Sequence, residues 1–464
     1  MQQSVVKILD CLNNTKNCAR AARISTTKGN SLDIYMKHKA PEDDSKLISK
    51  VLKSGHKSFL EHAVFTIAFC NVSALVEQFF IEFRLISFTI KSRRYVDFGN
   101  MGYYIPSFLD SSDKEKYVNH MNYLFDEYNL LIEKGIPKED ARFILPYSFF
   151  SNFYCTVNAR ELLHIINEIR TGRGARIDEL QDIAKQLIDQ LSVHMPVILD
   201  ELKDNSTRSL DDNLGHEVVD TTSATTPIDN NPDVRLISST RHQLTNLIFS
   251  YAINNNTAMY SVDEILHDEK MSNDIVKHLA NKIRARELEQ LNYTYYVSNI
   301  TLAGITHMVR HRIQSIVIPP VHDVNIHRYL TPQTVESDTQ LCQKYHQIFD
   351  VNAKIYSEML TKGYNPVQLS YFALSGNTFN ILTTMNAREL RLFFSIRACQ
   401  RAQWEIRDIA IKMLKLAQDE LPLLFNSFGP SCFLKGICPE GALSCGVPHA
   451  IKNKFASLNK ISTN

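Results

Sequence analysis

The chain of 464 residues carries 51 Lys and Arg against 50 Asp and Glu, and its net charge of +1 argues against nucleic acid as the main partner. Its length exceeds one ordinary core, so we expect at least two domains of a globular protein that is 44% hydrophobic and 22% charged. The start, MQQSVVKILDCLNN, lacks the apolar core of a signal peptide, and no apolar run is long enough to cross a membrane.

The elements predicted for the first half of the chain include both strand and helix. Residues 63–72, AVFTIAFCNV, are rich in β-branched and aromatic side chains and predict a strand, which a helix over 74–85 follows. Residues 114–135 have helical spacing and end at a glycine. The segment NARELLHIINEI, from Asn158, predicts a helix with an Asn cap and Glu three positions later, and a further helix covers 178–191. The fold class we expect is therefore α+β.

The second half of the chain repeats this order. We predict a strand over 291–300, a helix over 301–312, a capped helix from Asn386 and a last helix over 404–421. Four matches between the halves share one offset of 228 positions: Asn158 with Asn386, Gly135 with Gly363, Arg84 with Arg312, and Glu61 with Glu289. This pattern indicates a tandem duplication. The predicted parts are an N-terminal repeat (1–202), a polar linker (203–234), a C-terminal repeat (235–425) and a Cys-containing tail (426–464).

The segment MVRHRIQS places Arg310, His311 and Arg312 side by side after an apolar helix. Burying three cationic or near-cationic groups is costly unless an anion meets them. One interpretation is a helix C-terminus, where basic side chains face the negative end of the helix dipole. The other is an anion site, which the repeat favours because Glu82 and Phe83 stand opposite Arg310 and His311 in the first half.

Several longer motifs accompany this cluster. The first half carries GHKSFLEHAVFTIAF, FRLISFTIKSRRYV, GYYIPS, GIPKEDARFILP and TVNAREL, and the second half carries RHRIQS and NAREL followed by IRACQRAQWEIRDIA. In this combination the chain resembles the flavin-dependent thymidylate synthases, whose signature is R-H-R, seven residues and a serine, with R-Y close behind. The resemblance covers most of 1–200 and 245–425. It implies two repeats of that family's fold, each a small antiparallel sheet packed with helices.

The resemblance implies reductive methylation of dUMP to dTMP, in which methylenetetrahydrofolate gives the carbon and FAD, reduced by NADPH, gives the hydride. Family enzymes are homotetramers with active sites between subunits. Here the first repeat keeps SRRY (92–95) but has lost the Arg-His pair. The second keeps R-H-R, but Pro320 stands at the serine position and Ser370 stands where the first repeat has Arg142. The alternative is that a later HRY (327–329) restores Arg328 and Tyr329 after a short insertion. These complementary losses imply composite sites and a homodimer that imitates the tetramer.

The resemblance also implies roles for individual residues. The residues expected to bind substrate are Ser92, Arg93, Arg94, Arg142, His307, Arg310 and Arg397, of which Ser92, Arg310 and Arg397 are the catalytic candidates. The residues expected to bind FAD are Ser58, Glu61, Arg310, His311, Arg312, Asn386 and Arg388. No activating base is visible near Ser92 in the sequence, so we do not expect a covalent nucleophile. The SRRY segment also fits a solvated basic turn, and Asn386 is an ideal helix cap without any ligand.

Departures from the family pattern leave the substrate open. His307 stands where the family has Gln, and Ile90 stands at an acidic position. Arg401 and Gly174 stand where a family histidine meets the flavin. Two rival hypotheses therefore remain: a flavin enzyme of the same fold that acts on another pyrimidine nucleotide, and a non-catalytic nucleotide-binding pseudoenzyme.

The tail of the chain contains Cys432, Cys438, Cys445 and His449. Three thiols and an imidazole suit a structural zinc ion, although their spacing matches no standard zinc motif. The alternative is a loop with free thiols. Nine scattered cysteines in the whole chain favour a reduced, cytoplasmic protein over a disulfide framework.

Overall fold

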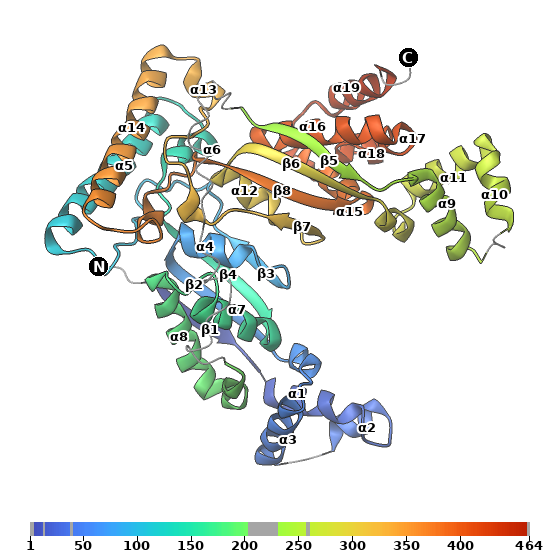
Figure 1. Cartoon of the computed structure of the whole chain (residues 1–464), viewed down its shortest axis with the longest axis horizontal. Helices are drawn as coiled ribbons and strands as arrows, with labels where there is room; N and C mark the ends of the chain where they lie inside the picture. Colours follow the sequence, from blue (N-terminus) through green and yellow to red (C-terminus); the bar gives the residue numbers. More distant parts are fainter. Residues whose placement is uncertain (1–3, 13, 38–39, 203–230, 257–259, 462–464) are drawn as a thin grey trace. The chain divides into compact units, whose positions relative to one another are not determined.

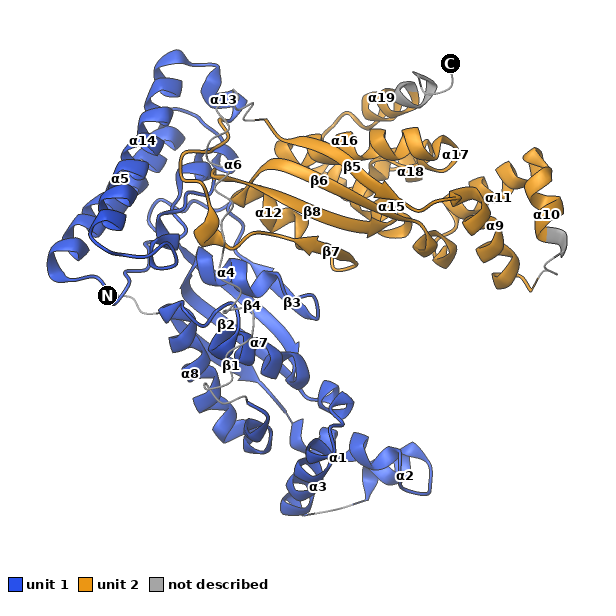
Figure 2. Cartoon of the chain, in the orientation of Figure 1, with its two compact units in different colours: residues 1–228, 332–375 blue, residues 229–331, 376–464 orange. Residues whose placement is uncertain are grey.

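The computed structural model divides into two compact units (Figure 2). Unit 1 comprises Met1–Ile228 with Pro332–Ser375, and unit 2 comprises Asp229–Thr331 with Gly376–Asn464. The units do not coincide with the sequence repeats, because residues 332–375 of the second repeat belong to unit 1. The structure describes residues 4–12, 14–37, 40–202, 231–256 and 260–461. Most of the predicted linker, 203–230, lies outside the described residues.

Unit 1 is built on a four-stranded antiparallel sheet with the strand order β1-β2-β4-β3 (Figure 1). The strands are β1 (Val5–Asp10), β2 (Val64–Ser73), β3 (Ile86–Ile90) and β4 (Phe150–Asn158). Alternate residues of the central strands, such as Phe65 and Ile67 on β2, are buried in one apolar core, as the period of a strand requires. The same core contains Leu162 and Ile166 of α7 (Ala159–Thr171) and Leu180 and Leu187 of α8 (Asp178–His194).

The first repeat contains further α-helices, labelled α, and short 3₁₀ helices, labelled η. They are α1 (Asn14–Ile24), α2 (Ser31–Met36), α3 (Pro41–Lys53), η1 (Ser58–His62), α4 (Ala74–Ile81), α5 (Ser111–Glu133), α6 (Lys138–Ala141), η2 (Arg142–Ile144) and η3 (Pro196–Glu201). Every residue of α4 is buried, including Glu77 and Gln78. The second repeat adds to unit 1 the elements α13 (Gln333–Glu336), α14 (Thr339–Thr361) and η7 (Gln368–Phe372).

Helices α5 and α14, which the offset of 228 superposes residue for residue, form an antiparallel pair in unit 1 (Figure 1). Lys116 near the start of α5 pairs with Glu358 near the end of α14, and Lys344 near the start of α14 pairs with Glu127 at 2.8 Å. Between them, His120 Nε2 lies 2.8 Å from Asn352 Oδ1. Equivalent helices of the two repeats are therefore joined as two subunits of a symmetric dimer would be.

The same symmetry appears in the backbone next to this pair. Tyr147 N donates to Ala373 O at 2.7 Å, and Ser375 N donates to Leu145 O at 2.9 Å. Each bond maps onto the other under the offset of 228, and Pro146 and Leu374 form an antiparallel bridge between them. A local twofold axis thus passes through this bridge inside unit 1.

Unit 2 contains the second sheet, with the equivalent strand order β5-β6-β8-β7. Its strands are β5 (Asp233–Ser239), β6 (Asn292–Thr301), β7 (Gln314–Val317) and β8 (Thr378–Asn386). Its helices are α9 (Gln243–Asn254), α10 (Tyr260–His267), α11 (Glu269–Asn281), η5 (Arg286–Gln290), α12 (Leu302–Met308), η6 (Val321–Asp323), α15 (Ala387–Arg397) and α16 (Trp404–Glu420). The tail adds α17 (Pro422–Phe425), α18 (Ser431–Lys435), η8 (Gly441–Leu443) and α19 (Pro448–Ile461).

The two sheets share local details as well as topology. Asn71 and Asn299 both have a left-handed backbone, with φ of 52° and 55°, at equivalent bulges on β2 and β6. In both units a buried carboxylate also accepts a hydrogen bond from the last backbone N–H of the strand that carries the bulge. Glu179 Oε1 accepts from Ser73 N at 2.8 Å, and Glu405 Oε1 accepts from Thr301 N at 2.6 Å. The predicted α+β class with two repeats is therefore confirmed.

The sequence predicted fewer strands than the structure contains. It predicted one strand in each repeat, and both occur as β2 and β6. The edge strands β3 and β7 have only five and four residues, and half or more of these residues are partly or fully exposed. Such short strands carry little apolar periodicity. The predicted helix 301–312 is also shorter in the structure, since α12 ends at Met308.

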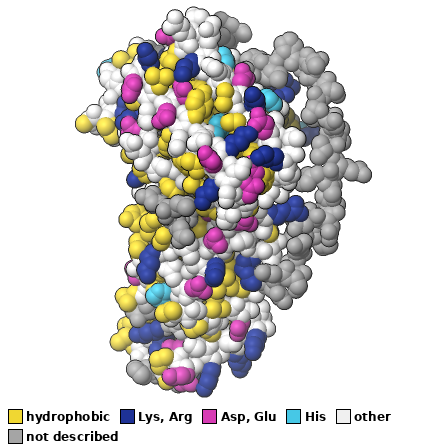
Figure 3. Space-filling view, turned by 90° about the vertical axis from the view of Figure 1, so that its left-hand side faces the viewer, with side chains coloured by type: hydrophobic (Ala, Val, Ile, Leu, Met, Phe, Trp, Pro, Cys, Tyr) yellow, Lys and Arg dark blue, Asp and Glu magenta, His cyan; other side chains and the backbone are white. Residues whose placement is uncertain are grey.

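The described part of the chain contains no helix that is both long and apolar enough to span a membrane. On the face shown in Figure 3, Lys and Arg side chains of the described residues are interspersed with Asp and Glu side chains. This mixture fits the near-neutral net charge.

Candidate functional site

The R-H-R segment forms the turn between α12 and β7 in unit 2. His311 N donates to Met308 O at 3.1 Å, which closes the turn. Arg310 and Arg312 are exposed, whereas His311 between them is buried. The two guanidinium groups therefore reach solvent just beyond a helix C-terminus, and the histidine faces the protein.

The His311 ring joins the R-H-R turn to α15. Its Nδ1 lies 2.9 Å from Glu389 Oε1, and its Nε2 accepts from Arg397 Nε at 3.0 Å. Arg397 Nη2 also donates to His307 O at 3.2 Å. The sequence-predicted residues His307, His311 and Arg397 are thus brought together, although His307 contributes its carbonyl to this contact. Burial lowers the pKa of His311, and the hydrogen bond to Glu389 opposes this effect.

The corresponding turn of unit 1 is closed by its own side chains. Glu82 forms an ion pair with Arg173, whose guanidinium carbon lies 4.7 Å from the centre of the Phe79 ring and 5.0 Å from that of Phe83. Phe83, which replaces the histidine, belongs to the apolar core. The corresponding turn of the first repeat therefore carries Arg173, an exposed cation that is paired with Glu82 and lies over two aromatic rings.

The SRRY segment follows β3 in unit 1 as a tight turn. Val96 N donates to Ser92 O at 2.9 Å, and Arg94 N donates to Ser92 Oγ at 3.3 Å. Arg93 points into the protein, where it forms an ion pair with the buried Glu77 and lies 4.8 Å from the centre of the Phe149 ring. Since Arg93 as a whole is only 7% exposed, it anchors the turn.

Glu139 brings Arg94 and Arg142 together. Arg94 Nε lies 2.7 Å from Glu139 Oε2, and Arg142 Nε donates to Glu139 O at 3.1 Å. Arg142 is buried, whereas the Arg94 side chain is 20% exposed. In the second repeat, Val367 and Ser370 stand at the positions of Glu139 and Arg142. The two arginines and their carboxylate therefore belong to the first repeat alone.

The remaining predicted flavin residues lie at helix ends. Ser58 begins η1, and Glu61 in the same element forms an exposed ion pair with Arg160 at 2.7 Å. Asn386 Oδ1 accepts from Glu389 N at 2.9 Å and caps α15. Arg388 forms an ion pair with Glu289, the equivalent of the Glu61–Arg160 pair. The structure thus assigns Asn386 the capping role that its sequence position predicts.

The zinc hypothesis for the tail has no support in the geometry. The described residues contain no group of three or more His, Cys, Asp or Glu side chains placed to hold a metal ion. Cys432, Cys438, Cys445 and His449 are all described, and the three thiols are free. The sequence did not indicate that Cys399 lies near the thiols of the tail. Burial raises its pKa, and Cys445 and Cys438 are close enough to add to this effect.

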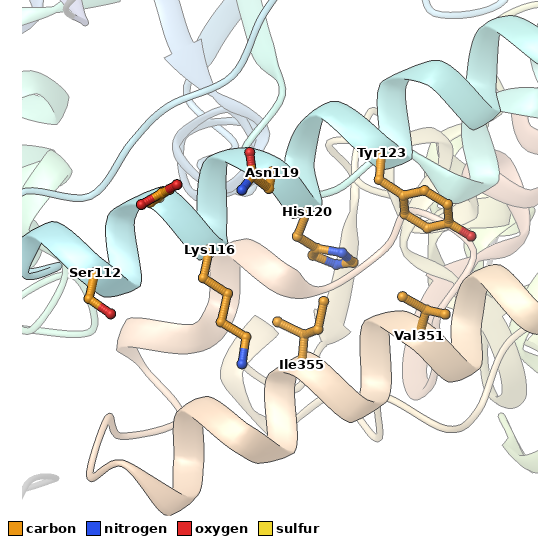
Figure 4. Close-up of a pocket in the computed structure, with 8 residues that line it drawn as sticks. Ser112, Lys116, Asn119, His120, Tyr123, Val351 and Ile355 are labelled. Carbon is orange, nitrogen blue, oxygen red and sulfur yellow. The ribbon is translucent and has the colours of Figure 1, made fainter.

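A separate hollow of about 450 Å³ lies on the α5–α14 pair. Figure 4 shows side chains from both helices around it, and the lining includes Ser112, Lys116, Asn119, His120, Tyr123, Val351 and Ile355. No residue predicted to bind substrate or flavin lines it. The hollow is therefore separate from the predicted site residues of unit 1 and of unit 2.

The sequence reasoning missed the acidic partners of these clusters. Glu77, Glu139 and Glu389 each hold a cationic or imidazole side chain of the predicted site. Their signal in the sequence was weak, since Glu389 fits a helix cap box and Glu77 lies within an apolar helix. Their counterparts by the offset of 228 offer the better signal, because Ile305 and Val367 replace Glu77 and Glu139 where the basic residue is also lost.

Comparison with known proteins matches both repeats. The family described as "Thymidylate synthase complementing protein" matches residues 7–197 and 235–423. A flavin-dependent thymidylate synthase of Geobacter sulfurreducens is 32% identical over 216 residues, which are 44% of this chain and 89% of that protein. One of Saccharolobus solfataricus is 36% identical over 207 residues, 38% of this chain and 78% of that protein.

A solved structure also resembles part of the chain. It is a UMP/dUMP methylase, PolB of Streptomyces cacaoi, bound with 5-Br dUMP. It is 25% identical, covers 42% of this chain and 93% of its own, and has a TM-score of 0.35.

Proposed function

Because this chain belongs to the thymidylate synthase complementing protein family, whose model matches both of its repeats, we propose that it converts dUMP to dTMP. Methylenetetrahydrofolate supplies the carbon, and NADPH supplies the electrons. The observation that carries the proposal is the division of cationic groups between the repeats. Arg94 and Arg142 lie together in unit 1, and Arg310, Arg312 and Arg397 lie around one turn in unit 2.

The residues of the R-H-R turn fit the pyrophosphate and isoalloxazine of FAD. Arg310 and Arg312 are exposed at one turn, and planar guanidinium groups pair well with pyrophosphate oxygens. When bound, the flavin supplies hydride chemistry that protein side chains cannot perform. Arg397 provides donors for a pyrimidine carbonyl, and a cation there stabilises negative charge as it develops on the ring.

The phosphate of dUMP is bound by residues of the first repeat. Arg94 is partly exposed and adjoins the turn at Ser92, whose hydroxyl accepts from Arg94 N and can itself donate to an anion. Arg142 lies behind it as a second cation. Arg93 is already paired with Glu77, so its role is to hold the turn.

We further propose that the chain acts as a homodimer with two composite sites. The local twofold axis at Pro146 and Leu374, together with the α5–α14 pair, supports one chain as the counterpart of two family subunits. Nine cysteines, all free, are compatible with a cytoplasmic location.

The first test is direct. Purified protein should be yellow or should take up FAD, and it should release tritium from C5-labelled dUMP when methylenetetrahydrofolate and NADPH are present. Bound flavin without release from dUMP, but with turnover of another pyrimidine nucleotide, would favour the rival substrate. A colourless protein that cannot be reconstituted with FAD would overturn the proposal and favour a pseudoenzyme.

A mixing experiment tests the composite sites. Arg94→Ala and Arg310→Ala should each abolish activity although they lie in different repeats. If each site combines repeats from two chains, co-refolded mixtures should regain about a quarter of wild-type activity, since half the dimers are mixed and one of their two sites is intact. If each site lies within one chain, the mixture should stay inactive. Full activity of either single variant would contradict composite sites altogether.

A further inference from the structure

One imidazole in unit 2 is held by three residues on a single stripe of α15. Glu389, Phe393 and Arg397 follow one another at intervals of four positions, so they share one face of the helix. Glu389 meets His311 Nδ1 at 2.9 Å, Arg397 meets Nε2 at 3.0 Å, and the Phe393 ring lies edge-on at 4.9 Å. Both ring nitrogens of His311 and one side of its ring are therefore contacted by residues of α15.

The hydrogen bonds assign the tautomer of His311. Arg397 Nε can only donate, so His311 Nε2 must accept and must carry no proton. The proton of the neutral ring then lies on Nδ1 and points to the Glu389 carboxylate. Burial, which lowers the pKa of His311, favours this neutral form. The direction of each bond in the chain Glu389–His311–Arg397 is thus determined.

The first repeat contains the same stripe without its chemistry. The offset of 228 places Glu161, Ile165 and Ile169 of α7 opposite Glu389, Phe393 and Arg397, and it places Phe83 opposite His311. Phe83, Ile165 and Ile169 are all buried in the apolar core. Arg170 lies one position beyond the register of Arg397. The chain of hydrogen bonds therefore occurs only in the repeat that keeps R-H-R.

We propose that Glu389 and His311 are positioning residues, which hold the Arg397 guanidinium in the orientation that receives a pyrimidine carbonyl. The guanidinium is held at Nε by His311 and at Nη2 by the His307 carbonyl, so its plane is set before substrate arrives. A long side chain that is already ordered loses less freedom on binding. The inference rests on the proposed function, because it assumes that Arg397 meets the substrate.

Variants of the two positioning residues test this inference. His311→Phe keeps a ring of the kind that the first repeat packs at this place, and it removes both hydrogen bonds. We expect dUMP to bind about 10-fold more weakly to it, as for a lost hydrogen bond to a charged group. Glu389→Ala should weaken dUMP binding to a similar extent, and Glu389→Gln, which can still accept from Nδ1–H, should restore part of the affinity.

The double variant separates positioning from a merely structural effect. Since the carboxylate acts through the imidazole, His311→Phe with Glu389→Ala should bind dUMP no more weakly than His311→Phe alone. Leu392→Ala, at an exposed position of the same helix, is the control and should bind normally. Additive losses in the double variant, or wild-type affinity in either folded single variant, would overturn the inference. Thermal unfolding establishes that each variant is folded.

A measurement without substrate distinguishes this inference from the proposed function. Nitrogen NMR of ¹⁵N-histidine protein, with the His311→Phe spectrum to assign the signal, should show His311 protonated at Nδ1 and unprotonated at Nε2. An Nε2–H or charged ring would overturn the positioning chain whatever the enzyme's activity. A wild-type protein that shows the Nδ1–H ring but binds no dUMP would refute the proposed function and, with it, the substrate role of Arg397.

Discussion

Glu139 offers a test of the phosphate site in which binding should become tighter. Its carboxylate neutralises Arg94 at 2.7 Å, and its backbone carbonyl holds Arg142. In the proposed function the dUMP phosphate competes with this carboxylate for the Arg94 guanidinium. Glu139→Gln removes the charge while the amide oxygen can still accept from Arg94 Nε. The backbone contact to Arg142 is unchanged.

The size of the effect follows from the exposure of the pair. Two unit charges about 4 Å apart interact by about 4 kcal/mol at an effective dielectric constant near 20. The Arg94 and Glu139 side chains are 20% and 27% exposed, so solvent screening and side-chain entropy reduce the net contribution to about 1 kcal/mol. Neutralising Glu139 should therefore lower the dUMP dissociation constant about fivefold.

Calorimetric titration of dUMP into the two proteins measures this change, and deoxyuridine, which lacks the phosphate, should show no gain. Glu358→Gln is the matched control, because it removes one carboxylate from the Lys116 ion pair in the same unit. Equal or weaker dUMP binding by folded Glu139→Gln would refute the reasoning that Arg94 binds the phosphate. A gain of the same size in Glu358→Gln would show that the effect comes only from net charge.

Three further predictions concern stability. Glu405→Ala should lower the free energy of unfolding by about 2 to 3 kcal/mol in urea titrations, because it strands the buried N–H and hydroxyl of Thr301; a loss below about 0.5 kcal/mol would contradict this. Asn71→Val should cost about 1 to 2 kcal/mol at its φ of 52°, whereas Asn71→Gly should be nearly neutral, and equal effects would argue against the left-handed backbone. Burial lowers the pKa of both His120 and His311 below the value of about 6.5 that a histidine has in the unfolded chain. Because the unfolded chain therefore binds more protons, the free energy of unfolding should fall as the pH drops from 7.5 to 5.5. A flat pH profile would contradict this prediction.

The sequence predicted the repeat and its family well, because both depend on residues whose order along the chain carries the information. The offset of 228 reappears in β2 and β6, in the bulges at Asn71 and Asn299, and in the paired helices α5 and α14. Local signals also located the caps, since Asn158 and Asn386 both accept from the N–H group three positions later.

The pairing of charges could not be predicted from the sequence. Glu139 lies 45 positions from Arg94, and Glu389 lies 78 positions from His311, so no local pattern joins them. The position of α14 in unit 1 could not be predicted either. The apolar face of a helix indicates that this face is buried, but it does not indicate which other element covers it. The partner of Arg93 could not be predicted either. Its neighbours in the sequence suggest a contact with a ligand, whereas in the structure Arg93 is buried in an ion pair with Glu77.

The location of α14 in unit 1 has a consequence for synthesis of the chain. α5 ends at Glu133 and its partner begins at Thr339, so about 200 residues separate them. At ribosomal rates of about 5 to 20 residues per second, α5 waits roughly 10 to 40 s for its partner. During that time α5 lacks the α14 partners of Lys116, His120 and Glu127. Nascent chains on one message can then pair their α5 helices with each other, so slow translation of residues 134–338 should favour dimers joined through α5.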